Sequence, residues 1–205
     1  MKSRIASAVL ALALVLPLRA RAGSYLESVS GDISGDRTAP SSLALDPGDN
    51  SISGTVVSGD LDYITLLNAT ASPIVSLTLT QFDTANPGEL AFVAIQAGSQ
   101  FTEPNTGTQV ANLLGYSHIG LPVGTDYLPL LGTGSGAIGF TPPLPGASYT
   151  LWIQQTGANP VGYTLDVRVP EPATWALLAL WAAALTQRRV SRTLASHKAR
   201  ARSAS

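Results

Sequence analysis

Aspartates in turn-forming stretches are the residues of this sequence with the clearest chemical potential. Carboxylates and backbone carbonyl oxygens in such turns are the ligands that Ca²⁺ prefers. Asp60 and Asp62, on either side of Leu61, are the candidate ligands, and further turn aspartates lie at Asp32, Asp36, Asp46 and Asp49. The spacing matches no EF-hand loop, and aspartate also favours turns because its side chain bonds the local backbone. Two interpretations stay open: a weak Ca²⁺ site of the extracellular kind, and turn formers with no cofactor.

No group of residues in the sequence is arranged for catalysis. The chain has no cysteine, which excludes disulfides, thiolate metal sites and cysteine nucleophiles. His118 is the only histidine before the C-terminal tail, and no Gly-x-Ser-x-Gly elbow is present. Residues 132–136 are rich in glycine but lack the lysine of a phosphate loop, so we expect a flexible loop there. Asn68 opens an Asn-Ala-Thr sequon that we interpret as incidental. These observations predict a protein that is not an enzyme.

The charge of the chain is distributed very unevenly. Between Gly23 and Val169 there are twelve carboxylates and two arginines, Arg37 and Arg168, so this region carries ten net negative charges. All other basic residues lie near the two ends of the chain. An acidic body repels nucleic acid and anionic lipid, and we therefore expect no nucleic-acid partner.

Residues 1–22 have the three parts of a secretory signal peptide. Lys2 and Arg4 are basic, residues 5–18 are apolar, and residues 20–22 (Ala-Arg-Ala) place small side chains at the −3 and −1 positions of a cleavage site. The apolar run is shorter than the roughly 20 residues of a membrane span. We predict export with cleavage after Ala22; an uncleaved anchor is the alternative.

Period-2 alternation dominates the rest of the chain and predicts β-strands. Residues 24–47 are polar and rich in turn formers, with at most one edge strand, and residues 102–139 predict long loops between short strands. A hairpin is expected around the turn at 58–60. The predicted strands are 51–57, 62–67, 74–82, 90–96, 149–154 and 163–168. The fold class is therefore all-β, a single β-sandwich of jelly-roll type over residues 23–168, large enough to bury one core.

Three stretches of this region resemble pre-peptidase C-terminal-like domains. They are residues 59–63 (Gly-Asp-Leu-Asp-Tyr), 144–151 (Leu-Pro-Gly-Ala-Ser-Tyr-Thr-Leu) and 162–165 (Gly-Tyr-Thr-Leu), in that order. The resemblance covers roughly residues 50–169. It implies a β-sandwich appended to a secreted bacterial protein, often with a binding role.

The C-terminal end has the order of parts of a sorting signal. Its motif is Val169, Pro170, Glu171, Pro172, Ala173 and Thr174. An apolar run over 175–185 follows, and then the basic pair Arg188 and Arg189. This arrangement resembles the PEP-CTERM signal. The resemblance implies recognition by an exosortase, a membrane protease-transpeptidase of Gram-negative bacteria, and an association with extracellular polysaccharide and biofilm matrix.

The physical properties of this segment agree with transient retention in the membrane. As a helix, residues 173–187 would be about 22 Å long at 1.5 Å per residue, short of the roughly 30 Å hydrocarbon core. Arg188 and Arg189 would act as a stop-transfer signal, keeping the basic tail, residues 190–205, in the cytoplasm. We predict a short transmembrane helix within residues 169–189. The alternative is a plain tail-anchored span behind a proline-containing linker.

The sequence thus predicts an exported, non-enzymatic protein of the cell surface or extracellular matrix. Its precursor would be anchored in the inner membrane of a Gram-negative bacterium, and its partners would be a sorting enzyme and extracellular polysaccharide. The alternative function is a calcium-stabilised accessory module that binds carbohydrate or protein. A hydrolase is the third hypothesis, and it lacks a nucleophile–base pair.

Overall fold

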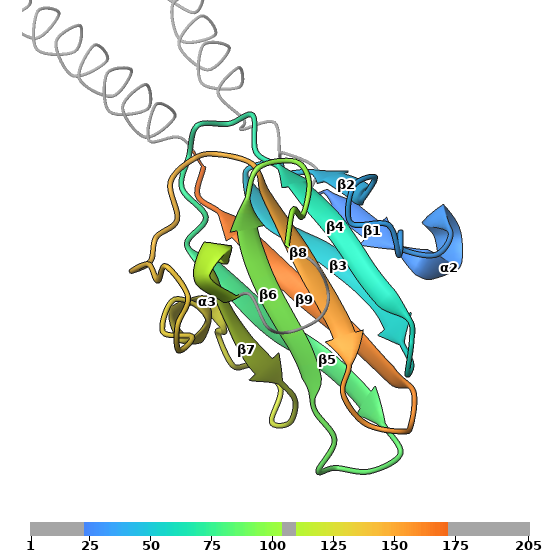
Figure 1. Ribbon diagram of the computed structural model, residues 1–205. Helices are drawn as coiled ribbons and strands as arrows, with labels where there is room; N and C mark the ends of the chain where they lie inside the picture. Colours follow the sequence, from blue (N-terminus) through green and yellow to red (C-terminus); the bar gives the residue numbers. More distant parts are fainter. Residues whose placement is uncertain (1–22, 104–109, 172–205) are drawn as a thin grey trace, which may run out of the picture. The chain divides into compact units, whose positions relative to one another are not determined.

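The computed structural model describes residues 23–103 and 110–171, which form two β-sheets packed face to face (Figure 1). The strands are β1 (Ser24–Leu26), β2 (Ser41–Ala44), β3 (Gly48–Val56), β4 (Leu61–Leu67), β5 (Ser76–Thr84), β6 (Ala91–Ala97), β7 (Gly115–Ile119), β8 (Tyr149–Gln155) and β9 (Val161–Val169). The helices are single turns: α2 (Glu27–Ser30), the 3₁₀ turn η1 (Val110–Asn112) and α3 (Leu128–Leu131). The prediction of an all-β fold is confirmed.

The two sheets are mixed. The four-stranded sheet has the order β1-β3-β9-β5, and the five-stranded sheet has the order β2-β4-β8-β6-β7. β1 runs parallel to β3, and β2 runs parallel to β4, so the turn-rich N-terminal segment adds one strand to an edge of each sheet. The expectation of at most one strand in this segment was wrong. A short strand can join the edge of a sheet without a hairpin turn, and the sequence then contains no turn motif that marks the strand.

The predicted hairpin at residues 58–60 was also wrong. Both of its strands exist, but β3 pairs with β9 and β4 pairs with β8, so the connection crosses from one sheet to the other. Period-2 alternation reports which face of a strand is buried and does not report its hydrogen-bonding partner.

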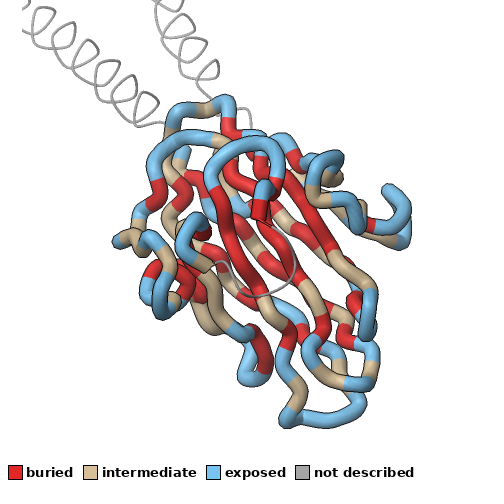
Figure 2. Tube along the Cα trace, in the orientation of Figure 1, coloured by how far each residue is buried: buried red, intermediate tan, exposed pale blue. Residues whose placement is uncertain are grey.

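The main core lies between the sheets and follows the alternation of the strands (Figure 2). Ile52 of β3 and Leu165 of β9 are fully buried from one side, and Ile64 of β4 and Leu151 of β8 from the other. Because the chain has no disulfide, burial of this apolar surface is the main stabilising contribution.

A second, aromatic core covers the outer face of the five-stranded sheet. Tyr63 of β4 stacks on Trp152 of β8 with ring centroids 6.0 Å apart, and Phe101 packs against both rings. Phe92 of β6 meets Trp152 edge-on at 4.9 Å. Phe101 and Leu113, from the described parts of the chain between β6 and β7, therefore cover one face of this sheet and bury positions that alternation alone would leave exposed.

The glycine-rich segment 132–136 is packed rather than loose. A Cβ at Gly132 would collide with the backbone of Phe140, and one at Gly134 would meet Tyr116 of β7 at 2.8 Å. The expectation of a flexible loop was wrong, since these glycines allow the backbone to approach its neighbours closely.

The predicted signal peptide (1–22), the membrane segment and the basic tail lie outside the described residues. Among the residues that the structure describes, no helix has the length and apolar character needed to cross a membrane. Of the sorting motif, Val169 is the buried last residue of β9, while Pro170 and Glu171 follow the strand and Glu171 is exposed.

Candidate metal centre

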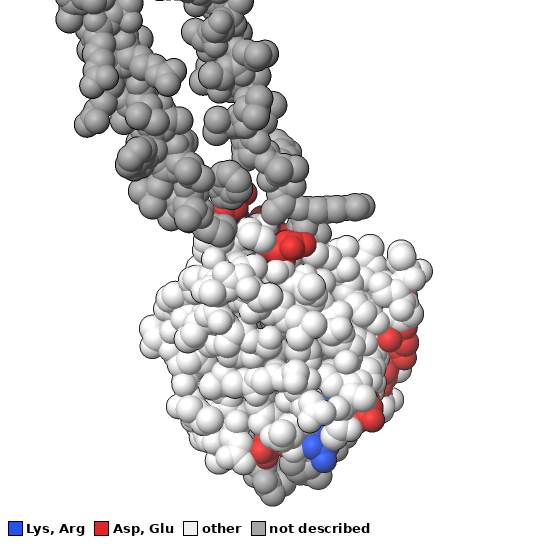
Figure 3. All heavy atoms as spheres, turned by 90° about the horizontal axis from the view of Figure 1, so that it is seen from above, with Lys and Arg blue, Asp and Glu red and all other residues white. Residues whose placement is uncertain are grey.

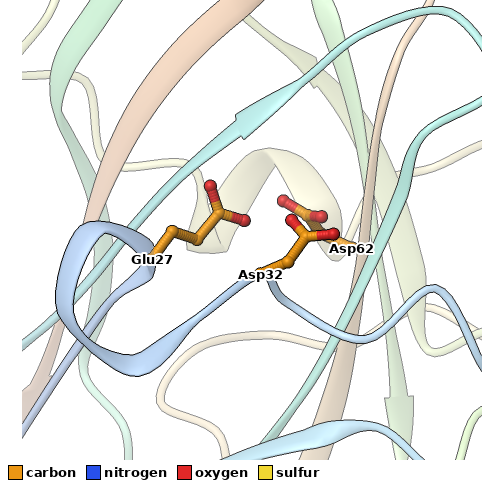
Figure 4. A group of neighbouring side chains, drawn as sticks. All are labelled: Glu27, Asp32 and Asp62. Carbon is orange, nitrogen blue, oxygen red and sulfur yellow. The ribbon is translucent and has the colours of Figure 1, made fainter.

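Three carboxylates from separate parts of the chain meet where the N-terminal segment crosses the start of β4. They belong to Glu27 of α2, Asp32 of the following loop and Asp62 of β4, and one oxygen from each lies within 4.8 Å of the others (Figure 4). We call these three residues the acidic cluster. Carboxylate oxygens converging in this way are the ligand type that Ca²⁺ and Mg²⁺ prefer.

Glu27 is held in place by the backbone. It opens the single turn of α2, and its Oε1 accepts the N–H of Ile33 at 3.2 Å. Its Oε2 accepts the N–H of Thr55 on β3 at 2.7 Å. One side chain therefore ties the N-terminal segment both to its own loop and to the sandwich, and each oxygen keeps a lone pair for another partner.

Gly31 and Ile33 position Asp32. The chain leaves α2 through Gly31 at φ +89°, a left-handed conformation that favours glycine. Two residues later, Ile33 is 1% exposed and anchors the loop in the main core. Asp32 lies between these two points and is exposed, so the cluster is open to solvent on the side of Asp32.

Asp62 is the buried member of the cluster. It shares the inward face of β4 with Ile64 and Leu66 and is 0% exposed. Its Oδ2 accepts the hydroxyl hydrogen of Tyr163, across the gap between the two sheets, at 2.6 Å. Its Oδ1 is buried and has no hydrogen-bond partner among the described residues. An unpaired buried carboxylate oxygen is costly, so a ligand for Oδ1 would stabilise the folded state.

The electrostatics of the site are those of carboxylates with no counter-charge. The pKa of Asp62 is raised to about 8, chiefly by burial and further by the charges of Glu27 and Asp60, while the hydrogen bond from Tyr163 opposes the shift. Burial also raises the pKa of Glu27, although its two backbone hydrogen bonds oppose the shift. Within the described ranges the one salt bridge is Arg168–Asp49, so no member of the acidic cluster has an ion-pair partner there. A bound cation would supply the missing positive charge.

Only one of the two residues proposed from sequence as Ca²⁺ ligands belongs to the acidic cluster. Asp62 is in the acidic cluster. Asp60 contributes no oxygen to the group of three, although its charge raises the pKa of Asp62. Asp62 was proposed from sequence because it lies next to a turn. Its period-2 position with Ile64 and Leu66, on an apolar face of the strand, is a stronger indication of an unusual role. Glu27 carried no such signal, because Thr55, which donates to its carboxylate, and Asp62 of the acidic cluster are 28 and 35 positions away in the chain.

The remaining turn aspartates have local roles or no resolved contact. Asp36 accepts the backbone N–H and the hydroxyl of Thr38, which is the turn-forming behaviour expected from sequence. Asp49 pairs with Arg168 on the neighbouring strand, with both side chains largely exposed. Asp46 is exposed. These three aspartates are not part of the acidic cluster.

Two other residues noted in the sequence, Asn68 and His118, lie outside the acidic cluster. The amide of the sequon residue Asn68 donates to Ser72 and accepts from Thr70, and the side chain is 8% exposed. His118 is exposed on β7, with its ring edge-on to Phe92 at 5.7 Å. Neither residue adds a ligand or a nucleophile to the acidic cluster.

One face of the domain carries acidic charge in separate places. On the face seen in Figure 3, most atoms belong to uncharged residues, and the acidic atoms form a few separate groups. On this face the acidic charge is therefore not concentrated in one patch, and the acidic cluster is distinguished by the burial of Asp62.

Comparisons with known proteins assign no family. No protein-family model matches the chain, and no curated protein is significantly similar to it. A similar solved structure is that of the Yersinia pseudotuberculosis-derived mitogen, with 14% identity, a TM-score of 0.30, and coverage of 62% of this chain and 90% of that one. A likeness at this level carries no argument about function. Both resemblances drawn from sequence motifs therefore stay predictions.

Proposed function

We propose that the described domain is a calcium-stabilised β-sandwich module of jelly-roll type with a binding rather than a catalytic role. The observation that carries this proposal is the buried Oδ1 of Asp62, which lacks a hydrogen-bond partner among the described residues, in a side chain that has an oxygen within 4.8 Å of oxygens of Glu27 and Asp32. A cation there would connect the N-terminal segment to β4. It would also offset the repulsion among three carboxylates that lie within 4.8 Å of one another.

The competing explanation is that Asp62 keeps a proton and no cation binds. Its raised pKa, about 8, allows a neutral carboxylic acid at pH 7. The two explanations differ in their response to Ca²⁺, because a cation must displace that proton in order to bind.

Thermal unfolding with chelator and with calcium separates them. With a dissociation constant of about 10⁻⁴–10⁻³ M, as in extracellular modules, about 10 mM Ca²⁺ stabilises the fold by roughly 1.4–2.7 kcal/mol. That corresponds to a rise in Tm of about 3–10 °C for a domain of this size. Asp32→Asn should weaken the rise, and the matched control Asp83→Asn, another exposed aspartate, should keep it. Identical melting curves for the wild-type protein with and without Ca²⁺ would remove the calcium function.

A second proposal concerns the whole chain, and it is favoured by the order of its terminal segments. We propose an exported protein of the cell surface or extracellular matrix, sorted by an exosortase-type enzyme and associated with extracellular polysaccharide. Support comes from the signal-peptide pattern at 1–22 and from the motif and basic pair within 169–189. Glu171, the one charged residue of the motif, is exposed just beyond the last strand.

Two measurements on the expressed precursor test this proposal. N-terminal sequencing of the secreted form should begin at Gly23. Mass spectrometry of the mature form should find no peptide from 175–188, and Glu171→Ala should leave an unprocessed membrane precursor. Replacing Arg188 and Arg189 should impair orientation instead. Persistence of the 175–188 peptides, together with normal processing of Glu171→Ala, would identify a plain anchor.

A further inference from the structure

We propose that the acidic cluster discriminates Ca²⁺ from Mg²⁺, and that Tyr163 sets this selectivity by preventing the cluster from rearranging into the near-ideal octahedral geometry that Mg²⁺ demands. This inference rests on the cation binding proposed above. It adds a specificity-determining residue that is not itself a ligand, and it depends on how firmly the two inner carboxylates are held.

Glu27 cannot move inward without losing backbone hydrogen bonds. Its two oxygens accept the N–H groups of Ile33 and Thr55, which belong to different elements. Ile33 is fixed by its burial in the core, and Thr55 is fixed within β3, which pairs with β9 along its whole length. A shift of the Glu27 carboxylate would therefore leave at least one N–H group without its acceptor.

Asp62 is restrained from the opposite side. The Tyr163 hydroxyl donates to Oδ2 at 2.6 Å, and the ring is 1% exposed. Gly54 of β3 leaves the space that this hydrogen bond needs, because a Cβ there would lie 2.7 Å from the Tyr163 oxygen. Because Oδ2 accepts this hydrogen bond and Oδ1 has no partner among the described residues, we expect Oδ1 to bind the cation as a monodentate ligand.

The two ions differ in how well they tolerate ligands that cannot rearrange. The oxygens of the acidic cluster lie within 4.8 Å of one another, close enough to share one cation. Mg²⁺ demands near-ideal octahedral geometry and gives up water reluctantly, whereas Ca²⁺ accepts irregular sites.

Asp32 provides the adjustable side of the site. It is exposed, and none of its side-chain oxygens is needed by a described hydrogen bond. Water can complete the coordination of Ca²⁺ there, up to the usual six to eight oxygens, roughly. Selectivity therefore resides in the two restrained carboxylates and not in the exposed one.

Titration calorimetry of the chelator-treated protein with CaCl₂ and with MgCl₂ tests the proposal. For the wild type, we expect a Mg²⁺ dissociation constant at least about ten times that for Ca²⁺. Tyr163→Phe removes the hydroxyl and frees Asp62 to move, and the ratio should fall to about 3 or less. The matched control is Tyr127→Phe, because Tyr127 is also buried and its hydroxyl bonds Gly120 instead of a carboxylate. It should keep the wild-type ratio.

Each outcome decides a separate question. Binding of neither ion by the wild type overturns the calcium function itself. Equal affinities for the two ions in the wild type overturn the selectivity proposal and leave cation binding intact. An unchanged ratio in a folded Tyr163→Phe protein overturns the role of Tyr163. Circular dichroism checks the fold, and should that variant not fold, the wild-type ratio decides alone.

Discussion

Replacing Gly54 with alanine should destabilise the protein by disturbing the contact between Tyr163 and Asp62. Gly54 is buried in β3, and a Cβ there would lie 2.7 Å from the Tyr163 hydroxyl oxygen and 3.1 Å from Oδ2 of Asp62. Atoms this close must move apart. Because Tyr163 is 1% exposed, it has no free volume into which to move.

The magnitude follows from two costs and one gain. Overpacking a dense core costs about 1–3 kcal/mol, and breaking a buried hydrogen bond to a carboxylate costs about 1–3 kcal/mol. Replacing glycine with alanine lowers the conformational entropy of the unfolded chain, which stabilises the folded protein by about 0.4–1 kcal/mol. We expect a net loss of about 2–4 kcal/mol, or roughly 5–15 °C in Tm for a domain of this size.

Urea unfolding in the presence of chelator measures the change in the free energy of unfolding, and the control is a glycine of β9. Gly162 is the strand neighbour of Tyr163, and a Cβ there would meet only the side chain of Asp83, at 3.5 Å, an ordinary contact. Gly162→Ala should therefore change the free energy of unfolding by less than about 0.5 kcal/mol. The Ca²⁺-induced rise in Tm should also shrink in Gly54→Ala and persist in Gly162→Ala. If the two variants unfold at the same urea concentration, the rigid placement of Tyr163 and Asp62 is refuted.

Three further predictions concern positions inside and outside the cluster. Ala71 has φ +58°, so Ala71→Gly should raise the free energy of unfolding by about 1 kcal/mol in urea titrations; a loss of stability would contradict this. Gly146→Ala should lower it by about 1–3 kcal/mol in the same assay, since a Cβ there would collide with the backbone of Ala71; wild-type stability would count against that packing. In chelator, the folded protein keeps the proton of Asp62 up to a pKa of about 8, whereas the unfolded chain loses it near 3.8. The free energy of unfolding should therefore fall as pH rises between these values, by at most about 1.4 kcal/mol per pH unit. In a pH series of urea titrations, the free energy of unfolding of Asp62→Asn should depend less on pH than that of the wild type. Equal slopes for the two proteins would refute the raised pKa.

Much of the fold could be predicted from the sequence because strand alternation is local. The strands β5, β6, β8 and β9 lie within a few residues of their predicted bounds, since each is a short local run of apolar and β-forming residues that ends near a turn. The absence of cysteine and the excess of carboxylates were likewise fixed by composition. The predicted partner of β3 was wrong, because hydrogen-bonding partners depend on which strands meet in space.

The acidic cluster likewise combines a position that the sequence determines with contacts that only the tertiary structure decides. Sequence alone determined that Asp62 follows a turn and shares a face with Ile64 and Leu66, which is an unusual position for a carboxylate. Only the tertiary structure decided that Glu27 and Asp32 would meet it. That meeting depends on a short N-terminal strand joining the sheet edge in parallel, and on Ile33 burying itself in the core. The pairing of Asp62 with Tyr163, 101 positions away, depends on the packing of one sheet on the other. No local pattern encodes such contacts, because they arise from the burial of many side chains at once.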